Sequence, residues 1–323
     1  MTRKHNWHVF AERLSEVSAA PWMGPNQWWT KYLFHFTDVK NAAQILSSGT
    51  ILSRNAAIAR GAMLNDNASP KVIAQTAERW KDFVRFYFRP KTPTQYRNEG
   101  FLSRDQRLLH AHCPIPVFFL FDAVSLLSLS DSEFSDRTLA SPYARTFTDP
   151  EDFSRLQFDY IYHEGPYDTS GPNISNYRQA EVVIPTHCSL EHLKRIVCRS
   201  AAEKQTLLEL LDTSTFFEWV DKITVDNRLY YANGTYVERA NLTKDRISFT
   251  FHTAQNAVFD VTLEIFDPDG NSYGRLVKEQ YNLGPTWTVN LTRLHDLGNY
   301  QAELRLDGDL AFKGEYLNDE MPF

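Results

Sequence analysis

The last third of the chain alternates apolar and polar residues in short runs, and this pattern restricts the fold more than any other feature. The runs include 247–252, 258–266 and 287–291. Alternation with a period of two is typical of strands that bury one face. Between two of these runs, residues 267–271 (Asp-Pro-Asp-Gly-Asn) have the composition of a hairpin turn. From about residue 223 the sequence therefore predicts a small all-β sandwich of immunoglobulin-like architecture.

The preceding part mixes strand and helix patterns, so we expect an α+β fold there. The strongest expected strands are 31–37, 83–88 and 117–121, and expected helices include 8–17, 41–47, 71–81 and 201–211, with 55–70 as a loop. Asp38 and Asp122 are suited to cap the helices that follow them. We therefore expect a first domain over residues 1–236 and a sandwich domain over residues 237–323.

Composition limits the classes of protein to which the chain can belong. It has 323 residues, with no apolar run of membrane-spanning length and no signal-peptide core after Met1. Three cysteines are too few for a disulfide framework. We expect a cytoplasmic protein without a membrane partner. The net charge of −6 arises in residues 237–323, which hold 8 basic and 14 acidic residues against 26 of each before them.

A basic and aromatic stretch lies between Arg79 and Arg107. It contains eight basic residues against three acidic ones, interleaved with Trp, Phe and Tyr. Cations that bind phosphates beside rings that stack on bases are typical of a groove for single-stranded nucleic acid. A core strand with solvated arginines explains the same composition, so the stretch alone decides nothing.

Two other segments carry candidate site residues. Glu181 opens an apolar strand pattern and follows a polar loop over residues 165–173, a place from which a carboxylate can stabilise positive charge. His35 and Thr37 are expected on one face of a strand, with Asn41 on the next helix. A buried histidine beside a capped helix is the alternative. The sequence His110-Ala111-His112-Cys113 lacks a second ligand cluster, so we expect no metal site.

The order of three segments resembles the DarT family of bacterial ADP-ribosyltransferases, which use NAD to modify bases of nucleic acid. They are His35-x-Thr37 with Asn41 and Gly49, the aromatic-Arg-Pro stretch 84–93, and Arg178-Gln179-Ala180-Glu181. The resemblance covers about residues 31–211. It implies an ADP-ribosyltransferase-like mixed fold, NAD as a substrate, no metal, and single-stranded DNA or RNA as the acceptor. The family's Pro-Met pair is Pro93-Thr94 here, a departure that concerns acceptor recognition.

The resemblance also implies roles for individual residues. Glu181 and His35 are the expected catalytic residues. The residues expected to bind NAD are His35, Thr37, Asn41, Arg54 and Tyr96. The residues expected to bind the acceptor substrate are Arg79, Arg89 and Arg178. Either Arg54 or Arg79 is expected to assist catalysis, and the sequence does not distinguish them.

The implied biological role is that of a toxin or anti-phage effector with an antitoxin or chaperone as its partner. The acidic residues 237–323 are a candidate surface for that partner, and their deletion is expected to spare transfer in vitro. Two alternatives stay open. One is a non-catalytic module that binds nucleic acid or protein on the same scaffold, and the other is an NAD glycohydrolase, for which water is the acceptor.

Overall fold

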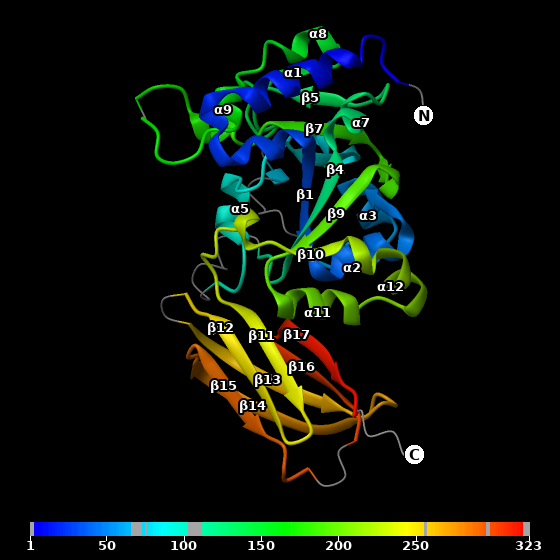
Figure 1. Cartoon of the computed structure of the whole chain (residues 1–323), viewed down its shortest axis with the longest axis vertical. Helices are drawn as coiled ribbons and strands as arrows, with labels where there is room; N and C mark the ends of the chain where they lie inside the picture. Colours follow the sequence, from blue (N-terminus) through cyan, green and yellow to red (C-terminus); the bar gives the residue numbers. More distant parts are fainter. Residues whose placement is uncertain are drawn as a thin grey trace. The chain divides into compact units, whose positions relative to one another are not determined.

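A computed structural model describes residues 3–65, 73–74, 76–102, 112–168, 170–254, 257–294 and 298–318. The backbone divides into two compact units (Figure 1). The first contains residues 1–36, 48–97 and 118–196, and the second contains residues 37–47, 98–117 and 197–323. In this division residues 37–47, 98–117 and 197–236 group with the sandwich strands, and the expected domain boundary at residue 236 stays a prediction.

The main sheet has eight strands in the order β10-β9-β4-β1-β3-β7-β5-β6. Their bounds are β1 Tyr32–Asp38, β3 Phe83–Tyr87, β4 Pro116–Asp122, β5 Glu133–Ser135, β6 Thr146–Phe147, β7 Glu181–Pro185, β9 Leu193–Cys198 and β10 Ile223–Val225. Strand β4 is buried from Pro116 to Phe121, as expected for an apolar run in the interior of a sheet. A separate ribbon pairs β2 (Thr50–Leu52) with β8 (His187–Ser189).

Short helices connect these strands. In the order of the chain they are α1 His8–Ala19, η1 Pro21–Lys31, α2 Val39–Ser48, α3 Arg54–Ala59, η2 Glu78–Asp82, α5 Pro93–Asn98, α7 Ala123–Leu127, α8 Pro150–Phe153, α9 Phe158–Ile161, α10 Ile174–Tyr177, η3 Leu190–His192, α11 Ala201–Glu209, α12 Thr213–Trp219, η4 Val220–Lys222 and η5 Asn227–Leu229. In the first unit, α1 lies over β5 and beside α8 (Figure 1). Its Phe10 packs edge-on against Phe134 and Phe153, which anchors the helix to the sheet.

Capping residues explain which helix predictions were right. The carboxylates of Asp38 and Asp122 accept from the amides of Lys40 and Ser125, as expected for the helices that follow them. The loop expected over residues 55–70 was wrong at its start, because Ser53 caps helix α3 through the amide of Ala56. The helix expected over residues 71–81 lies partly outside the described residues, and its end is the 3₁₀ helix η2.

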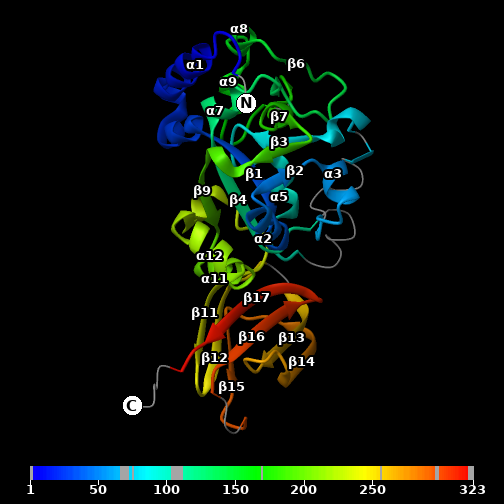
Figure 2. The ribbon, with the colours of Figure 1, turned by 90° about the vertical axis from the view of Figure 1, so that its right-hand side faces the viewer.

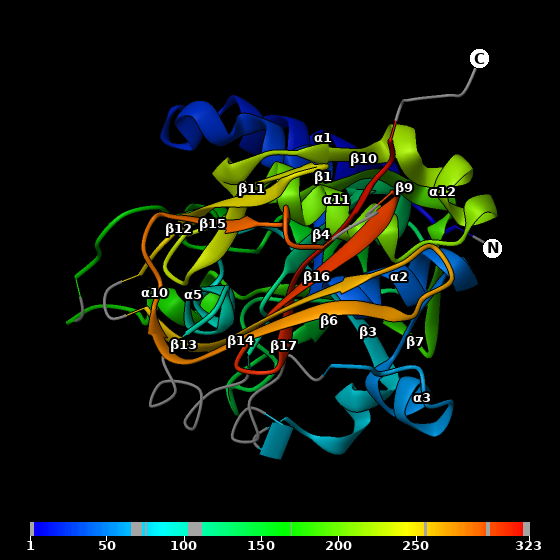
Figure 3. The same cartoon turned by 90° about the horizontal axis from the view of Figure 1, so that it is seen from below.

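The C-terminal strands form two antiparallel sheets, as predicted. One has the order β11-β12-β15 and the other β14-β13-β16-β17. The bounds are β11 Tyr236–Thr243, β12 Arg246–His252, β13 Val258–Phe266, β14 Ser272–Asn282, β15 Thr286–Asn290, β16 Tyr300–Leu306 and β17 Asp309–Tyr316. The sheets form two layers (Figures 2 and 3). The turn at residues 267–271 joins β13 to β14, where the hairpin was predicted.

The core of the sandwich includes residues from outside its strands. Phe101 and Ala202 are buried in the same cluster as Phe249, Phe259 and Phe312. In addition, the Thr206 hydroxyl accepts a hydrogen bond from the amide of Lys313 at 3.0 Å. A cut between residues 236 and 237 would expose these apolar side chains to water. Deletion of residues 237–323 is therefore expected to disturb the fold of the second unit, which argues against the expectation that it spares transfer.

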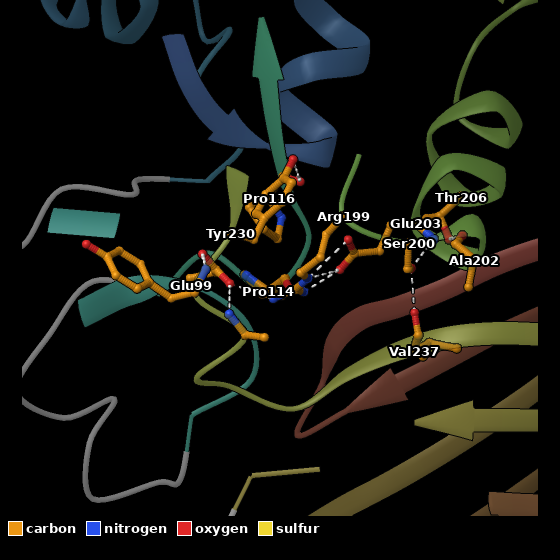
Figure 4. Close-up of polar contacts among 12 residues, drawn as sticks. Glu99, Pro114, Pro116, Arg199, Ser200, Ala202, Glu203, Thr206, Tyr230 and Val237 are labelled. Carbon is orange, nitrogen blue, oxygen red and sulfur yellow. Dashed lines mark hydrogen bonds and ion pairs between the residues drawn. The ribbon is translucent and has the colours of Figure 1, made fainter. Parts of the chain in front are cut away.

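A buried cluster of charges joins distant segments of the second unit (Figure 4). Arg199 has a fully buried side chain between the carboxylates of Glu99 and Glu203, and its guanidinium carbon lies 3.8 Å from the centre of the Tyr236 ring. Glu99 also accepts hydrogen bonds from the amides of Tyr231 (3.0 Å) and Ala232 (2.8 Å). Each buried charge is therefore paired and hydrogen-bonded, the condition under which such groups are tolerated.

The approach of backbone segments beside this cluster requires glycine. A Cβ atom added to Gly234 would lie 2.5 Å from the carbonyl oxygen of Glu99 and 2.9 Å from Gly100. Both distances are shorter than van der Waals contact, so no other residue fits at position 234 without a shift of the backbone.

The acidic group of Glu203 should make stability depend on pH. Burial raises the pKa of Glu203 to about 7 from 4.5, against the opposing effect of the Arg199 charge. A group whose pKa is higher in the folded state contributes stability that is present below pH 4.5 and lost as the pH rises through about 7. The free energy of unfolding, measured by urea denaturation, should therefore fall across this range, and Glu203→Gln should flatten the slope. Equal slopes for both proteins would contradict this assignment.

Candidate active site

Glu181 is the first residue of β7 and is held by the neighbouring strand β3. Its side chain is only 1% exposed. The register pairs Glu181 with Tyr87 across the two strands. The carboxylate accepts hydrogen bonds from Nε and Nη2 of Arg85, the second at 2.6 Å, and from the amide of Leu139 at 3.1 Å. The predicted catalytic carboxylate is therefore buried, charge-paired and fixed in orientation.

Arg85 is a site residue that sequence reasoning missed. On β3 the side chains of Val84 and Phe86 are buried, whereas Arg85 and Tyr87 lie on the other face. From that face the side chain of Arg85 reaches diagonally across to Glu181, which lies two pairs further along the ladder and on the same face. The alternation of the strand was visible in the sequence, but the register with β7 was not, so the partner of Arg85 could not be identified.

His35 joins the same network through the backbone of Arg85. Its Nδ1 lies 3.0 Å from the carbonyl oxygen of Arg85. Because a carbonyl oxygen only accepts, Nδ1 carries the proton and Nε2 of the neutral ring is left as an acceptor. Burial lowers the pKa of His35, which favours this neutral form. Arg85 thus links the two residues that were predicted to be catalytic, His35 by its backbone and Glu181 by its side chain.

The end of β5 and the segment that follows it position Glu181 from the other side. The hydroxyl of Ser135 accepts a hydrogen bond from the backbone amide of Glu181 at 3.0 Å and donates to the carbonyl of Arg137 at 2.8 Å. Four residues later, the amide of Leu139 reaches the carboxylate itself. No motif marked this segment in the sequence, because its contribution depends mainly on backbone groups.

Burial also affects Tyr87, the cross-strand neighbour of Glu181. Burial, with a further contribution from the Glu181 charge, raises the pKa of Tyr87 to about 12. The phenol is therefore neutral at physiological pH and can donate a hydrogen bond.

Two predicted substrate-binding arginines bind the loop that precedes Glu181. Arg89 is buried, and its guanidinium donates to the carbonyls of Pro90 and His163 and pairs with Glu164 at 3.3 Å. Arg178 donates to Nδ1 of His163 at 2.7 Å and to the carbonyl of Gly165 at 2.5 Å. The structure thus gives both residues a role in shaping the loop, and their contact with an acceptor strand stays a prediction.

Burial, followed by the charge of Arg178, lowers the pKa of His163. This direction agrees with the geometry, because an arginine nitrogen can only donate and Nδ1 must be unprotonated to accept. The loop continues along residues 165–173, of which Thr169 lies outside the described residues.

The remaining predicted residues lie in several elements. Arg79 is exposed, stacks on Trp80 at 3.8 Å and pairs with Glu133 at 3.2 Å. Arg54 is the first residue of α3, and Tyr96 is 56% exposed on α5. In the second unit, Thr37 is buried near the end of β1 and Asn41 lies in the first turn of α2. These placements leave the NAD-binding assignments as predictions.

The described residues form neither a metal site nor a membrane-spanning helix. Over the described ranges, no three histidine, cysteine or acidic side chains are grouped as a metal ion would require. His110 lies outside those ranges, and His112 pairs with Asp309 at 3.3 Å. In the same part of the chain, no helix has the length and apolarity needed to cross a membrane.

Solved structures share the fold of this chain. The Thermus sp. 2.9 DarT in complex with ADP-ribosylated single-stranded DNA is 17% identical, with a TM-score of 0.50 over 62% of this chain and 96% of that one. The Thermosipho africanus DarTG in complex with ADP-ribose is 14% identical, with a TM-score of 0.50 over 67% of this chain and 54% of that one. The Thermus sp. 2.9 DarT in complex with NAD+ is 18% identical, with a TM-score of 0.48 over 62% and 98%.

No curated protein matches the sequence. A family profile described as "ssDNA thymidine ADP-ribosyltransferase, DarT" matches residues 34–231, which is more than half of the chain and includes His35, Arg85 and Glu181. The chain therefore belongs to the DarT family of single-stranded-DNA thymidine ADP-ribosyltransferases.

Proposed function

We propose that this chain transfers ADP-ribose from NAD to thymidine in single-stranded DNA, with Glu181 as the catalytic carboxylate. The observation that carries the proposal is the buried carboxylate of Glu181, fixed by Arg85 and Leu139, with a neutral His35 bound to the backbone of the same Arg85, in a chain of the DarT family. Thermus sp. 2.9 DarT has been solved with NAD+ and with ADP-ribosylated single-stranded DNA.

The donor and acceptor groups of the site fit a ribosyl substrate. A carboxylate has about four acceptor positions. Among the residues that the structure describes, Arg85 and Leu139 use three of them. The position left on Oε2 of Glu181 can accept from a ribose hydroxyl. Nε2 of His35 is a further acceptor for an amide or hydroxyl group.

The reaction breaks the bond between the ribose anomeric carbon and nicotinamide, and its electron pair leaves with nicotinamide. As in glycoside cleavage, the sugar then carries positive charge. The negative charge of Glu181 stabilises that state, and its fixed orientation means that little reorganisation is needed. A nitrogen of the base forms the new bond and loses its proton, for which Glu181 is the proposed acceptor.

Labelled NAD tests the acceptor class. We expect wild-type protein to label a pool of single-stranded DNA, and we expect no label on parallel pools of RNA and of protein. Label on RNA instead would contradict the proposed acceptor. Free labelled ADP-ribose without labelled polymer would support an NAD glycohydrolase, and no consumption of NAD would support a non-catalytic binding module.

Such an activity would damage the DNA of the cell that makes it. We therefore extend the proposal to a cytoplasmic toxin or anti-phage effector with a neutralising partner, an antitoxin or a chaperone. One structural match is a DarTG protein in complex with ADP-ribose. Co-expression with a candidate antitoxin should restore growth to cells that produce the wild-type protein.

A further inference from the structure

We propose that Arg85 is a positioning residue for the reaction, which acts by holding the carboxylate of Glu181 in one orientation. This inference rests on the proposed function of Glu181. The two partners are buried to different extents. The side chain of Arg85 is 26% exposed, whereas that of Glu181 is only 1% exposed. Arg85 therefore supplies the positive charge that Glu181 needs, since water hardly reaches the carboxylate.

The geometry of the pair fixes the orientation of the carboxylate group. Nε and Nη2 of Arg85 donate to different oxygens of Glu181, so the planar guanidinium and the planar carboxylate form a fork-to-fork pair. The amide of Leu139 is a third donor to the carboxylate, and it binds Oε1. With these bonds in place, a rotation of the carboxylate would break at least one of them. The acceptor position left on Oε2 consequently points in a constant direction.

Arg85 is itself held on a rigid element. It lies in the middle of β3, which pairs with β7 from Phe83 to Tyr87. Its carbonyl oxygen also binds the ring of His35. Groups that are placed by strands and by hydrogen bonds keep a catalytic side chain close to its productive geometry. A displacement of a catalytic group by about 1 Å can lower the rate about 100-fold. Loss of the fixed orientation of Glu181 is therefore expected to slow the reaction.

Substitution of Arg85 should lower the rate of transfer more than the affinity for NAD. We expect Arg85→Met to reduce kcat by about 100-fold with KM for NAD changed by less than about threefold. Arg85→Lys keeps the charge but loses the fork, so it should recover part of the rate. Arg155→Met is the matched control, because Arg155 is 75% exposed and pairs with Asp152 in its own turn. It should behave as the wild type.

The split between kcat and KM separates positioning from a merely structural role. A structural defect would not be expected to lower kcat alone, nor to be partly relieved by Arg85→Lys. If Arg85→Met does not fold, Arg85→Lys alone decides, since its kcat should still be lower than that of Arg155→Met.

The possible outcomes separate this inference from the proposed function. An active wild type and a lowered kcat in the Arg85 variants, with KM for NAD nearly unchanged, would support it. Arg85 variants with wild-type kcat would overturn it and leave the function of Glu181 intact. A raised KM with unchanged kcat would also overturn it, because Arg85 would then only bind substrate. Inactive wild-type protein would refute the proposed function itself.

Discussion

Glu181→Gln should reduce the rate of nicotinamide release from NAD by about 1,000-fold, while NAD still binds. The substitution keeps the size of the side chain and removes the negative charge that would stabilise the ribosyl cation. Losses of about 100-fold to 10,000-fold are typical when one such electrostatic or proton-accepting group is removed. Nicotinamide release gives the rate, and titration calorimetry gives the affinity for NAD.

Glu191→Gln is the matched control for that experiment. Glu191 is an exposed residue of η3, and the same chemical change there should leave both the rate and the affinity unchanged. If Glu181→Gln released nicotinamide within about tenfold of the wild-type rate, a catalytic role on the scale typical of such groups would be ruled out.

Arg199→Met should lower the free energy of unfolding by about 3–5 kcal/mol, because it leaves two buried carboxylates without their shared cation. Glu99 and Glu203 have almost no exposed surface in the second unit, so water cannot replace the guanidinium. A change of this size is a large share of the stability of a typical domain. Denaturation in urea measures it.

Arg228→Met is a suitable comparison for Arg199→Met. Arg228 is 75% exposed and pairs with Asp226, and exposed pairs contribute less than about 1 kcal/mol. The double variant Arg199→Met with Glu203→Met should regain part of the lost stability, since one of the two unpaired charges is then absent. Equal effects of the two arginine substitutions would mean that the buried cluster does not stabilise the second unit.

Much of the fold was predictable where local chemistry decided it. The turn at residues 267–271 and the alternation on either side gave the hairpin of β13 and β14, and Asp122 gave the start of α7. The motif of His35 and the Arg-Gln-Ala-Glu segment suggested the family, and the profile match confirmed it, together with the prediction of an enzyme that uses NAD. The family description names single-stranded DNA and does not support RNA, the other acceptor expected from the sequence.

What could not be predicted depends on contacts between distant segments. The partner of Arg85 depends on the register of β3 on β7. A shift of that register by one residue would place Glu181 on the other face of the sheet from Arg85. Arg89 and Arg178 have the chemistry of phosphate-binding residues, yet in the structure their guanidinium groups donate hydrogen bonds to the loop at residues 163–165. The cluster around Arg199 joins residues 100 positions apart, for which the sequence has no local signal.

The mass of a thymidine-containing single-stranded oligonucleotide, recorded after incubation with NAD, tests the central claim most directly. With wild-type protein we predict a gain of one ADP-ribose, and no gain with Glu181→Gln or with an oligonucleotide that lacks thymidine. An equal gain with the Glu181 variant, or on the oligonucleotide without thymidine, would contradict the account.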